Sequence, residues 1–119
     1  MISRIWHGWT SRENADKYEQ LLRAEVLPGI HRIRGYTGAY LLRRDAADDE
    51  VEFITITQFT DMKAVREFAG ADYERAVIAP GATGLLKHYD ERSQHYETLL
   101  TPSDVRAMAA RTSGRNRVV

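Results

Sequence analysis

Hydrophobic and polar positions alternate along four stretches of the chain, and this period of two predicts β-strands. The stretches are residues 2–10, 35–45, 50–59 and 92–100. Residues 46–49, Ala-Ala-Asp-Asp, form a connection between the second and third stretches that is short enough for an antiparallel hairpin. The pattern therefore places a hairpin in the middle of the chain and a single strand near each end.

Apolar residues recur at intervals of three and four in other segments, and this spacing predicts helices. The first helix begins at a capping box, Thr10-Ser11-Arg12-Glu13, and ends near Leu27, because Pro28-Gly29 interrupts its hydrogen bonds. A second helix covers residues 61–69 and stops at Gly70, and a further helical piece covers residues 72–78. The order strand, helix, strand, strand, helix, strand predicts an α+β, ferredoxin-like fold with a four-stranded antiparallel sheet.

Both faces of the predicted sheet carry large apolar side chains. Phe53 and Phe59 have one parity in the third strand, whereas Ile54 and Ile56 have the other. In the first strand, Trp6 likewise has the opposite parity to Ile5 and Trp9. Helices cover only one face of such a sheet, so the second apolar face predicts contact with another copy of the chain, as a homodimer.

Length and composition narrow the class of protein. A chain of 119 residues with 43% apolar and 29% charged residues is typical of one soluble domain. Its start runs directly into a strand pattern, and no stretch approaches the roughly 20 apolar residues that span a membrane, so we expect a cytoplasmic location. The lack of cysteine excludes disulfides, thiolate nucleophiles and cysteine metal sites.

The charges balance at 17 against 17 but are unevenly distributed. Residues 101–119 carry four arginines against one aspartate, so we separate a basic C-terminal tail from a domain over residues 1–100. Within the tail, Ser103 to Arg111 can form a short helix with Ser103 as N-cap. The domain has no basic face and no base-stacking motif, which argues against nucleic acid as a partner.

Several short motifs, in this order and spacing, resemble a known family. They are Ile5-Trp6-His7-Gly8-Trp9-Thr10, Arg43-Arg44, Glu52-Phe53, Ala64-Val65-Arg66-Glu67-Phe68-Ala69-Gly70, Ala76-Val77 with Pro80, and His95-Tyr96-Glu97. Over residues 1 to about 98 the chain is similar to the antibiotic-biosynthesis-monooxygenase-like proteins. This resemblance implies a homodimeric α/β barrel with a pocket in each subunit between sheet and helices.

The resemblance also implies a choice of activities. Relatives include oxygenases that convert phenols into quinones without metal or flavin, quinol monooxygenases and haem-degrading enzymes. The haem enzymes use a histidine after the second helix, a tryptophan in that helix and an asparagine in the first strand. Here the first two positions fall near Ile78 and at Phe68, and the first strand has no asparagine. The haem arrangement is therefore not expected, although His88 or His95 could bind iron with another geometry. We predict no cofactor.

The candidate site residues are histidines and aromatic side chains. His95 or His7 could act as a general base, since an imidazole titrates near neutral pH. Trp6, Phe68 and Tyr73 could form the apolar wall of a pocket, and His88 could lie at its rim. Each also has a purely structural alternative: a core or interface contact for the aromatic residues and His95, a solvated loop for His88, and a pairing with Glu52 or Glu97 for His7.

Two functions follow from these candidates. The first is a cofactor-independent monooxygenase that acts on a small aromatic or quinol-type substrate. The alternative is a non-catalytic dimeric protein of the same fold that binds a small apolar molecule or serves as a scaffold. The four histidines lack the short spacing of a metal site, and phosphate-binding and nucleophile motifs are absent.

Overall fold

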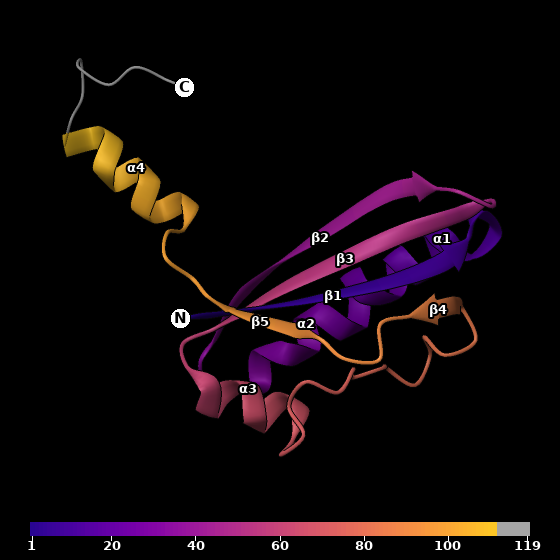
Figure 1. Ribbon diagram of the computed structural model, residues 1–119, viewed down its shortest axis with the longest axis horizontal. Coiled ribbons are helices and arrows are strands. Elements are labelled where there is room, and N and C mark those ends of the chain that lie inside the picture. The colour runs from indigo at the N-terminus through magenta and orange to yellow at the C-terminus, as the bar shows by residue number, and fades with distance from the viewer. Residues whose placement is uncertain (112–119) are drawn as a thin grey trace.

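An antiparallel sheet forms one layer of the protein in a computed structural model, which describes residues 1–111. Part of the predicted basic tail, including Arg115 and Arg117, lies outside the described residues. The strands are β1 (Ile2–Ser11), β2 (Tyr36–Ala46), β3 (Glu50–Phe59), β4 (Leu86–Tyr89) and β5 (Gln94–Glu97). Their order is β2-β3-β1, with β4 and β5 both paired to the other edge of β1 (Figure 1). The predicted α+β, ferredoxin-like fold is confirmed.

Of the predicted fourth strand, residues 92–100, only β5 is a strand in the structure, and β4 precedes it in a stretch where no strand was predicted. Both pair with β1, and residues 90–93 between them face only Trp6 and His7. Residues 90–93 do not pair continuously with β1, because some of their backbone groups form hydrogen bonds elsewhere. The Trp6 indole donates to the Asp90 carbonyl at 2.7 Å, and the Ser93 N–H donates to the Glu74 carbonyl. The sheet therefore has five strand segments where four were predicted.

The first helical segment is longer than predicted. It comprises α1 (Arg12–Leu21), a π-helical turn η1 (Leu22–Val26), α2 (Leu27–Gly29) and a 3-10 turn η2 (Ile30–Arg32). Its N-cap is Ser11 and not Thr10, because the Ser11 hydroxyl accepts the N–H of Asn14 at 3.2 Å. In η1 the Leu27 N–H donates to the Leu22 carbonyl, and this shift of the bonding pattern precedes Pro28, which lacks an N–H.

Helix α3 (Met62–Ala69) agrees with the predicted second helix and ends at Gly70. The helical piece predicted over residues 72–78 is wrong, because this stretch has no helix. Its backbone groups bond to distant parts of the chain instead. The carbonyls of Tyr73 and Arg75 accept from the Arg4 guanidinium, and the Ala76 N–H donates to the Glu91 carbonyl. Tertiary hydrogen bonds therefore replace the helical ones that the apolar spacing favoured.

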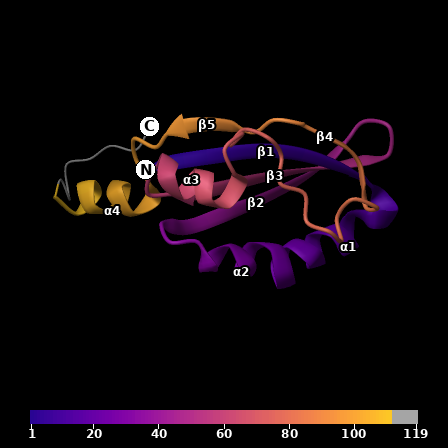
Figure 2. The same cartoon turned by 90° about the horizontal axis from the view of Figure 1, so that it is seen from below.

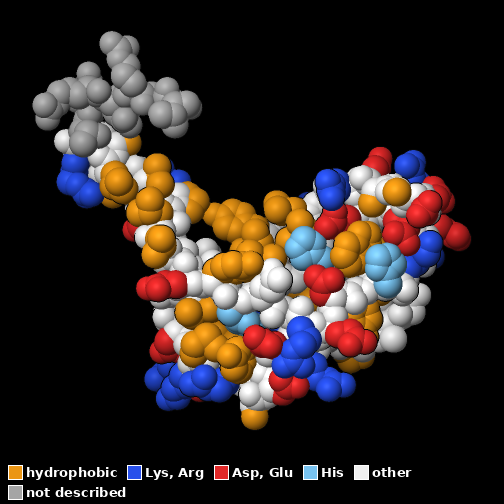
Figure 3. Space-filling model, in the orientation of Figure 1, with side chains coloured by type: hydrophobic (Ala, Val, Ile, Leu, Met, Phe, Trp, Pro, Cys, Tyr) orange, Lys and Arg blue, Asp and Glu red, His pale blue; other side chains and the backbone are white. Residues whose placement is uncertain are grey.

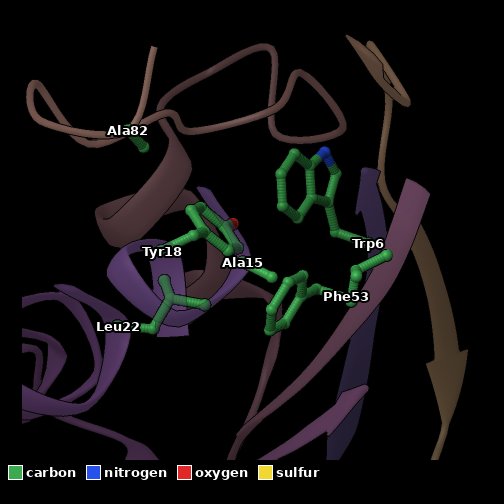
Figure 4. Packing of buried hydrophobic residues seen from close by; sticks show 7 residues of the cluster. Trp6, Ala15, Tyr18, Leu22, Phe53 and Ala82 are labelled. Carbon is green, nitrogen blue, oxygen red and sulfur yellow. The ribbon is translucent and has the colours of Figure 1, made fainter. Parts of the chain in front are cut away.

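The helical segment, α3 and the irregular stretch between α3 and β4 lie on the same face of the sheet (Figure 2). The main core cluster contains Trp6, Tyr18 and Phe53, and the rings of Tyr18 and Phe53 meet edge to face at 4.9 Å (Figure 4). A second cluster contains Ile30, Phe59 and Val65. Even-numbered positions of β1, including Trp6, point into this core, and odd-numbered positions lie on the open face.

After β5 the chain continues into α4 (Pro102–Arg111), which projects from the body (Figures 1 and 3). Thr101 and Asp104 cap its N-terminus through reciprocal bonds, so the cap lies two residues before Ser103. None of its described residues is buried, and Leu99, Leu100 and Val105 are more than half exposed. Within residues 1–111, no helix has the length and hydrophobicity that crossing a membrane requires.

Candidate functional site

Two hollows lie between the sheet and the helical segment. The inner chamber, of about 50 Å³, reaches Arg4, Trp6 and Thr57 on the sheet. The outer groove, of about 430 Å³, is bordered by α2, η2 and residues 77–81. The hollows adjoin, since they share six lining residues: Val26, Ile30, Phe68, Val77, Ile78 and Ala79. A mostly apolar hollow with few polar groups is the usual form of a small-molecule site.

Trp6 forms part of the sheet side of the inner chamber, and two local features hold its ring there. Its indole N–H donates to the Asp90 carbonyl at 2.7 Å. A Cβ atom added at Gly8, the next inward position of β1, would lie only 2.7 Å from the Trp6 ring. Glycine at this position therefore leaves room for the indole ring, which a larger residue would displace.

Phe68 belongs to both hollows and comes from the last turn of α3. Asp61 caps this helix by accepting the Ala64 N–H at 2.9 Å. Phe68 also packs on Phe59, with ring centroids 5.6 Å apart, and so is tied to β3. Trp6 and Phe68, two predicted wall residues, thus line the inner chamber.

Arg4 is the charged side chain of the inner chamber, and it is only 5% exposed. Its guanidinium lies over the Phe68 ring, 5.2 Å from the centroid. Nη2 donates to the carbonyls of Tyr73 at 3.3 Å and Arg75 at 2.9 Å, whereas Nε has no partner. Burial lowers the pKa of Arg4 to about 10, so the group still carries its charge at neutral pH.

His95 lies beside Arg4 on the same face, since the two residues are paired across β1 and β5. Its ring meets the edge of Tyr73 at a centroid distance of 5.2 Å, and neither ring nitrogen has a hydrogen-bond partner. Burial, with a smaller contribution from the Arg4 charge, lowers the pKa of His95. Neither His95 nor Tyr73 lines the inner chamber or the outer groove.

His7 and His88 lie on the open face of the sheet, away from both hollows. His7 Nδ1 is 2.8 Å from Glu52, one of the two carboxylates considered from sequence. The Arg44 guanidinium also contacts Glu52, and the bond to His7 is the larger cause that holds the pKa of Glu52 below its usual range. His88 belongs to β4, stacks on Trp9 at 4.5 Å and contacts Glu50. The six sequence candidates are thus divided between two faces.

Arg4 was not among the site residues predicted from the sequence. A signal was available: Arg4 has the same parity as Trp6 in a strand whose even positions face the core. A charge at a core-facing position is uncommon unless it is paired or functional. The tyrosine of the inner chamber, Tyr18, was also assigned only to the apolar stripe of the first helix.

The donor set of the hollows does not suit haem iron. No histidine, cysteine or methionine lines either hollow in residues 1–111. Ile78 occupies the region where haem-degrading relatives were expected to place their ligand, and burial raises the pKa of Tyr18, which disfavours its phenolate. Elsewhere in the described chain, no group of three histidine, aspartate or glutamate side chains could hold a metal ion.

Comparisons with known proteins identify the fold. No family model and no curated protein matches the sequence. A solved structure from Nitrosomonas europaea, assigned to the antibiotic biosynthesis monooxygenases, is 16% identical, with 84% of this chain and 100% of that chain covered and a TM-score of 0.59. SnoaB, a cofactor-independent oxygenase from Streptomyces nogalater, is 19% identical, with coverage of 85% and 95% and a TM-score of 0.55.

A third similar structure is the heme-degrader MhuD from Mycobacterium tuberculosis, with two hemes bound in its active site. It is 16% identical, with 85% of this chain and 98% of that chain covered and a TM-score of 0.56. At these identities the likeness concerns the fold. The resemblance to the antibiotic-biosynthesis-monooxygenase-like proteins that the sequence motifs indicated is confirmed at that level.

Proposed function

We propose that this protein oxygenates a small aromatic or quinol-type substrate, without metal or flavin, in the hollows between sheet and helices. The observation that carries the proposal is the adjoining inner chamber and outer groove, with Trp6 and Phe68 as aromatic walls. Aromatic side chains favour a flat aromatic ligand through stacking and edge contacts. The groove volume of about 430 Å³ lies in the range of small-molecule sites.

The proposed reaction needs a deprotonated substrate. A phenolate gives one electron to dioxygen, the two radicals combine to form a carbon–oxygen bond, and loss of water leaves a quinone. One oxygen atom enters the product and the other leaves as water, so the reaction balances without an external reductant. The protein's role is to orient the substrate, exclude water and accept the proton. His95 is the candidate base beside the hollows, and His7 is the candidate on the open face.

A naphthol provides the test. With 1-naphthol, purified protein should consume dioxygen and form 1,4-naphthoquinone, and label from ¹⁸O₂ should appear in the new carbonyl. General-base contributions are typically 10²- to 10⁴-fold, so His95→Ala should reduce the rate at least about a hundredfold, whereas His7→Ala should do so only if the substrate binds at the open face. Mass spectrometry detects the labelled quinone, and an oxygen electrode measures the consumption of dioxygen. Absence of turnover across a panel of phenols and quinols would count against the reaction.

The alternative is a non-catalytic protein that binds a small apolar molecule. The placement of the histidines favours it, since none of them lines the inner chamber or the outer groove within residues 1–111. The two functions differ in a simple way. A binder would hold 1-naphthol unchanged in the presence of dioxygen, with an affinity that Trp6→Ala and Phe68→Ala lower and that His95→Ala leaves alone.

We also infer that the protein is a homodimer formed through the open face of the sheet. Large apolar side chains lie exposed there, with Tyr40 43%, Leu42 46% and Tyr96 51% accessible. Figure 3 shows hydrophobic side chains gathered on this face beside the projecting C-terminal helix. Exposed apolar patches of this kind usually mark interaction sites. A two-fold axis would bury the same patch on both copies.

A further inference from the structure

The inner chamber contains a buried cation that has no anionic partner. Arg4 is 5% exposed, and it forms no ion pair with any carboxylate of residues 1–111. Its recorded hydrogen bonds use Nη2 alone and go to neutral carbonyls. Nε, which carries an N–H, is buried without a partner. A guanidinium has five N–H donors, so this side chain retains donors for a further acceptor.

More exposed arginines of the same protein behave differently. Arg43 pairs with Asp16 and Glu19, Arg44 with Glu52, and Arg92 with Asp72 and Glu74. Water can hydrogen-bond to the N–H donors of these exposed side chains, yet each also pairs with a carboxylate. Bulk water cannot reach the N–H donors of Arg4, yet Arg4 pairs with no carboxylate of residues 1–111. A buried charge without a counter-charge opposes folding, so its presence in a chamber that adjoins the larger outer groove is a sign of function.

We propose that Arg4 binds the anionic oxygen of an aromatic ligand, a carboxylate or a phenolate, whose ring lies in the outer groove. The proposal rests on the proposed function, namely that the hollows hold a small aromatic molecule. Guanidinium groups bind planar oxyanions through two parallel hydrogen bonds, and such charge-assisted bonds are strong in a site shielded from water. Arg4 is therefore assigned as the specificity-determining residue of the hollows.

The shapes of the two hollows set the orientation of the ligand. A water molecule needs roughly 10–15 Å³ of such volume, so the inner chamber of about 50 Å³ has room for a carboxylate or hydroxyl group and little more. The outer groove is bordered mainly by aliphatic residues and accepts the ring. Glu25 and Arg32 line the groove as well, so its charged groups are of opposite sign and favour neither charge on the ring.

This assignment has a consequence for the proposed oxygenation. A cation beside a phenolic oxygen favours the ionised form, which is the form that gives an electron to dioxygen. Arg4 would then lower the pKa of a bound phenol and reduce the demand on a general base.

Calorimetric titration with 1-naphthoate and the uncharged 1-naphthamide tests the assignment. The wild-type protein should prefer naphthoate by about tenfold or more, which is the scale of one charge-assisted hydrogen bond. Arg4→Met removes the charge and keeps an apolar stem. Arg4→Gln keeps a donor for the Tyr73 and Arg75 carbonyls without the charge. Both variants should bind the two probes equally, and the naphthamide affinity should change by less than about threefold. Arg92→Met, a surface control, should retain the preference.

An equal affinity of the wild-type protein for the two probes would overturn the assignment, as would an unchanged preference in both Arg4 variants. A structural role for Arg4 would instead lower the melting temperature of both variants and leave the preference intact in whichever one folds. The result is separable from the oxygenase test. If naphthoate binding depends on Arg4 but naphthol is not turned over, the anion site is supported and the proposed oxygenation is refuted. If naphthol is turned over but the anion is not preferred, the oxygenation is supported and the anion site is refuted.

Discussion

Residue parity in β1 separates two kinds of chemistry. Inward positions bring the Arg4 cation next to the unpartnered imidazole of His95, in a region with apolar walls. Outward positions bring His7 to the carboxylate of Glu52 and stack Trp9 on His88. On the inward side the Arg4 cation therefore lacks a carboxylate partner within residues 1–111, whereas on the outward side His7 is paired with the carboxylate of Glu52. A one-residue change of register in β1 would exchange these side chains between the faces.

The buried position of His95 predicts a pH dependence of stability. Its pKa is lowered in the folded protein, so the unfolded chain binds more protons from just above the usual histidine pKa down to the lowered value. The free energy of unfolding should therefore decrease as the pH falls through this window. In His95→Leu the decrease between pH 7.5 and 5.5 should be smaller. Urea midpoints of both proteins at several pH values give the slopes, and equal slopes would refute the prediction.

The short helix α3 shows how one element positions the site. It is eight residues long, below the length at which a helix is stable by itself, and depends on its cap and on packing. The Asp61 cap and the contact of Phe68 with Phe59 supply these. Because Phe68 lines both hollows, the stability of α3 and the shape of the site are linked.

Removal of the α3 cap should therefore have a measurable cost. Asp61→Ala leaves the Ala64 N–H without its acceptor and should reduce the free energy of unfolding by about 1 kcal/mol. Asp61→Ser restores a capping oxygen and should recover most of that loss. Chemical denaturation of the three proteins provides the comparison. If the alanine and serine variants are equally destabilised, the Asp61 side chain acts through something other than capping.

The sequence predicted the elements whose bonds are local. The hairpin of β2 and β3, the start of the first helix to within a residue, and the end of α3 at Gly70 all follow from alternation, caps and glycine. The prediction from sequence failed where hydrogen bonds to residues distant along the chain determine the local structure. Residues 72–78 have helical spacing, but Arg4 takes two of their carbonyls. Trp6 and Phe68, which line the inner chamber, were proposed from their aromatic character. Arg4 was not proposed, although it shares the parity of Trp6, and its lack of an anionic partner is not visible in a sequence.

On the scale of the whole molecule, two apolar surfaces extend beyond the core. One is the open face of the sheet, and the other is the arm formed by Leu99, Leu100 and α4. Obligate dimers commonly bury more than about 2,000 Å² in total and have little stability as monomers. An open face that pairs with a second copy, together with the arm, can supply an interface of that kind.

The inferred dimer leads to a specific test. Light scattering at tens of micromolar should give twice the chain mass of 13.6 kDa, and the melting temperature should rise with protein concentration. Leu42→Lys places a charge on the open face and should weaken the dimer. Val77→Lys is a matched control, since Val77 is 47% exposed against 46% for Leu42 but lies on the helix-covered side. A wild-type monomer at these concentrations would rule out the assembly.

The central position of β1 has a consequence for the order of folding. The first strand to be synthesised pairs with β3 on one edge and with β4 and β5 on the other, and Ser3 hydrogen-bonds to Thr98, 95 residues away. Contacts so distant along the chain form slowly, because a long loop must close before they contribute. During synthesis on the ribosome, both edges of β1 therefore remain unpaired until the later strands have emerged. The local hairpin of residues 36–59 can form before β4 and β5 are made. The sheet is completed only after almost the entire domain has been made.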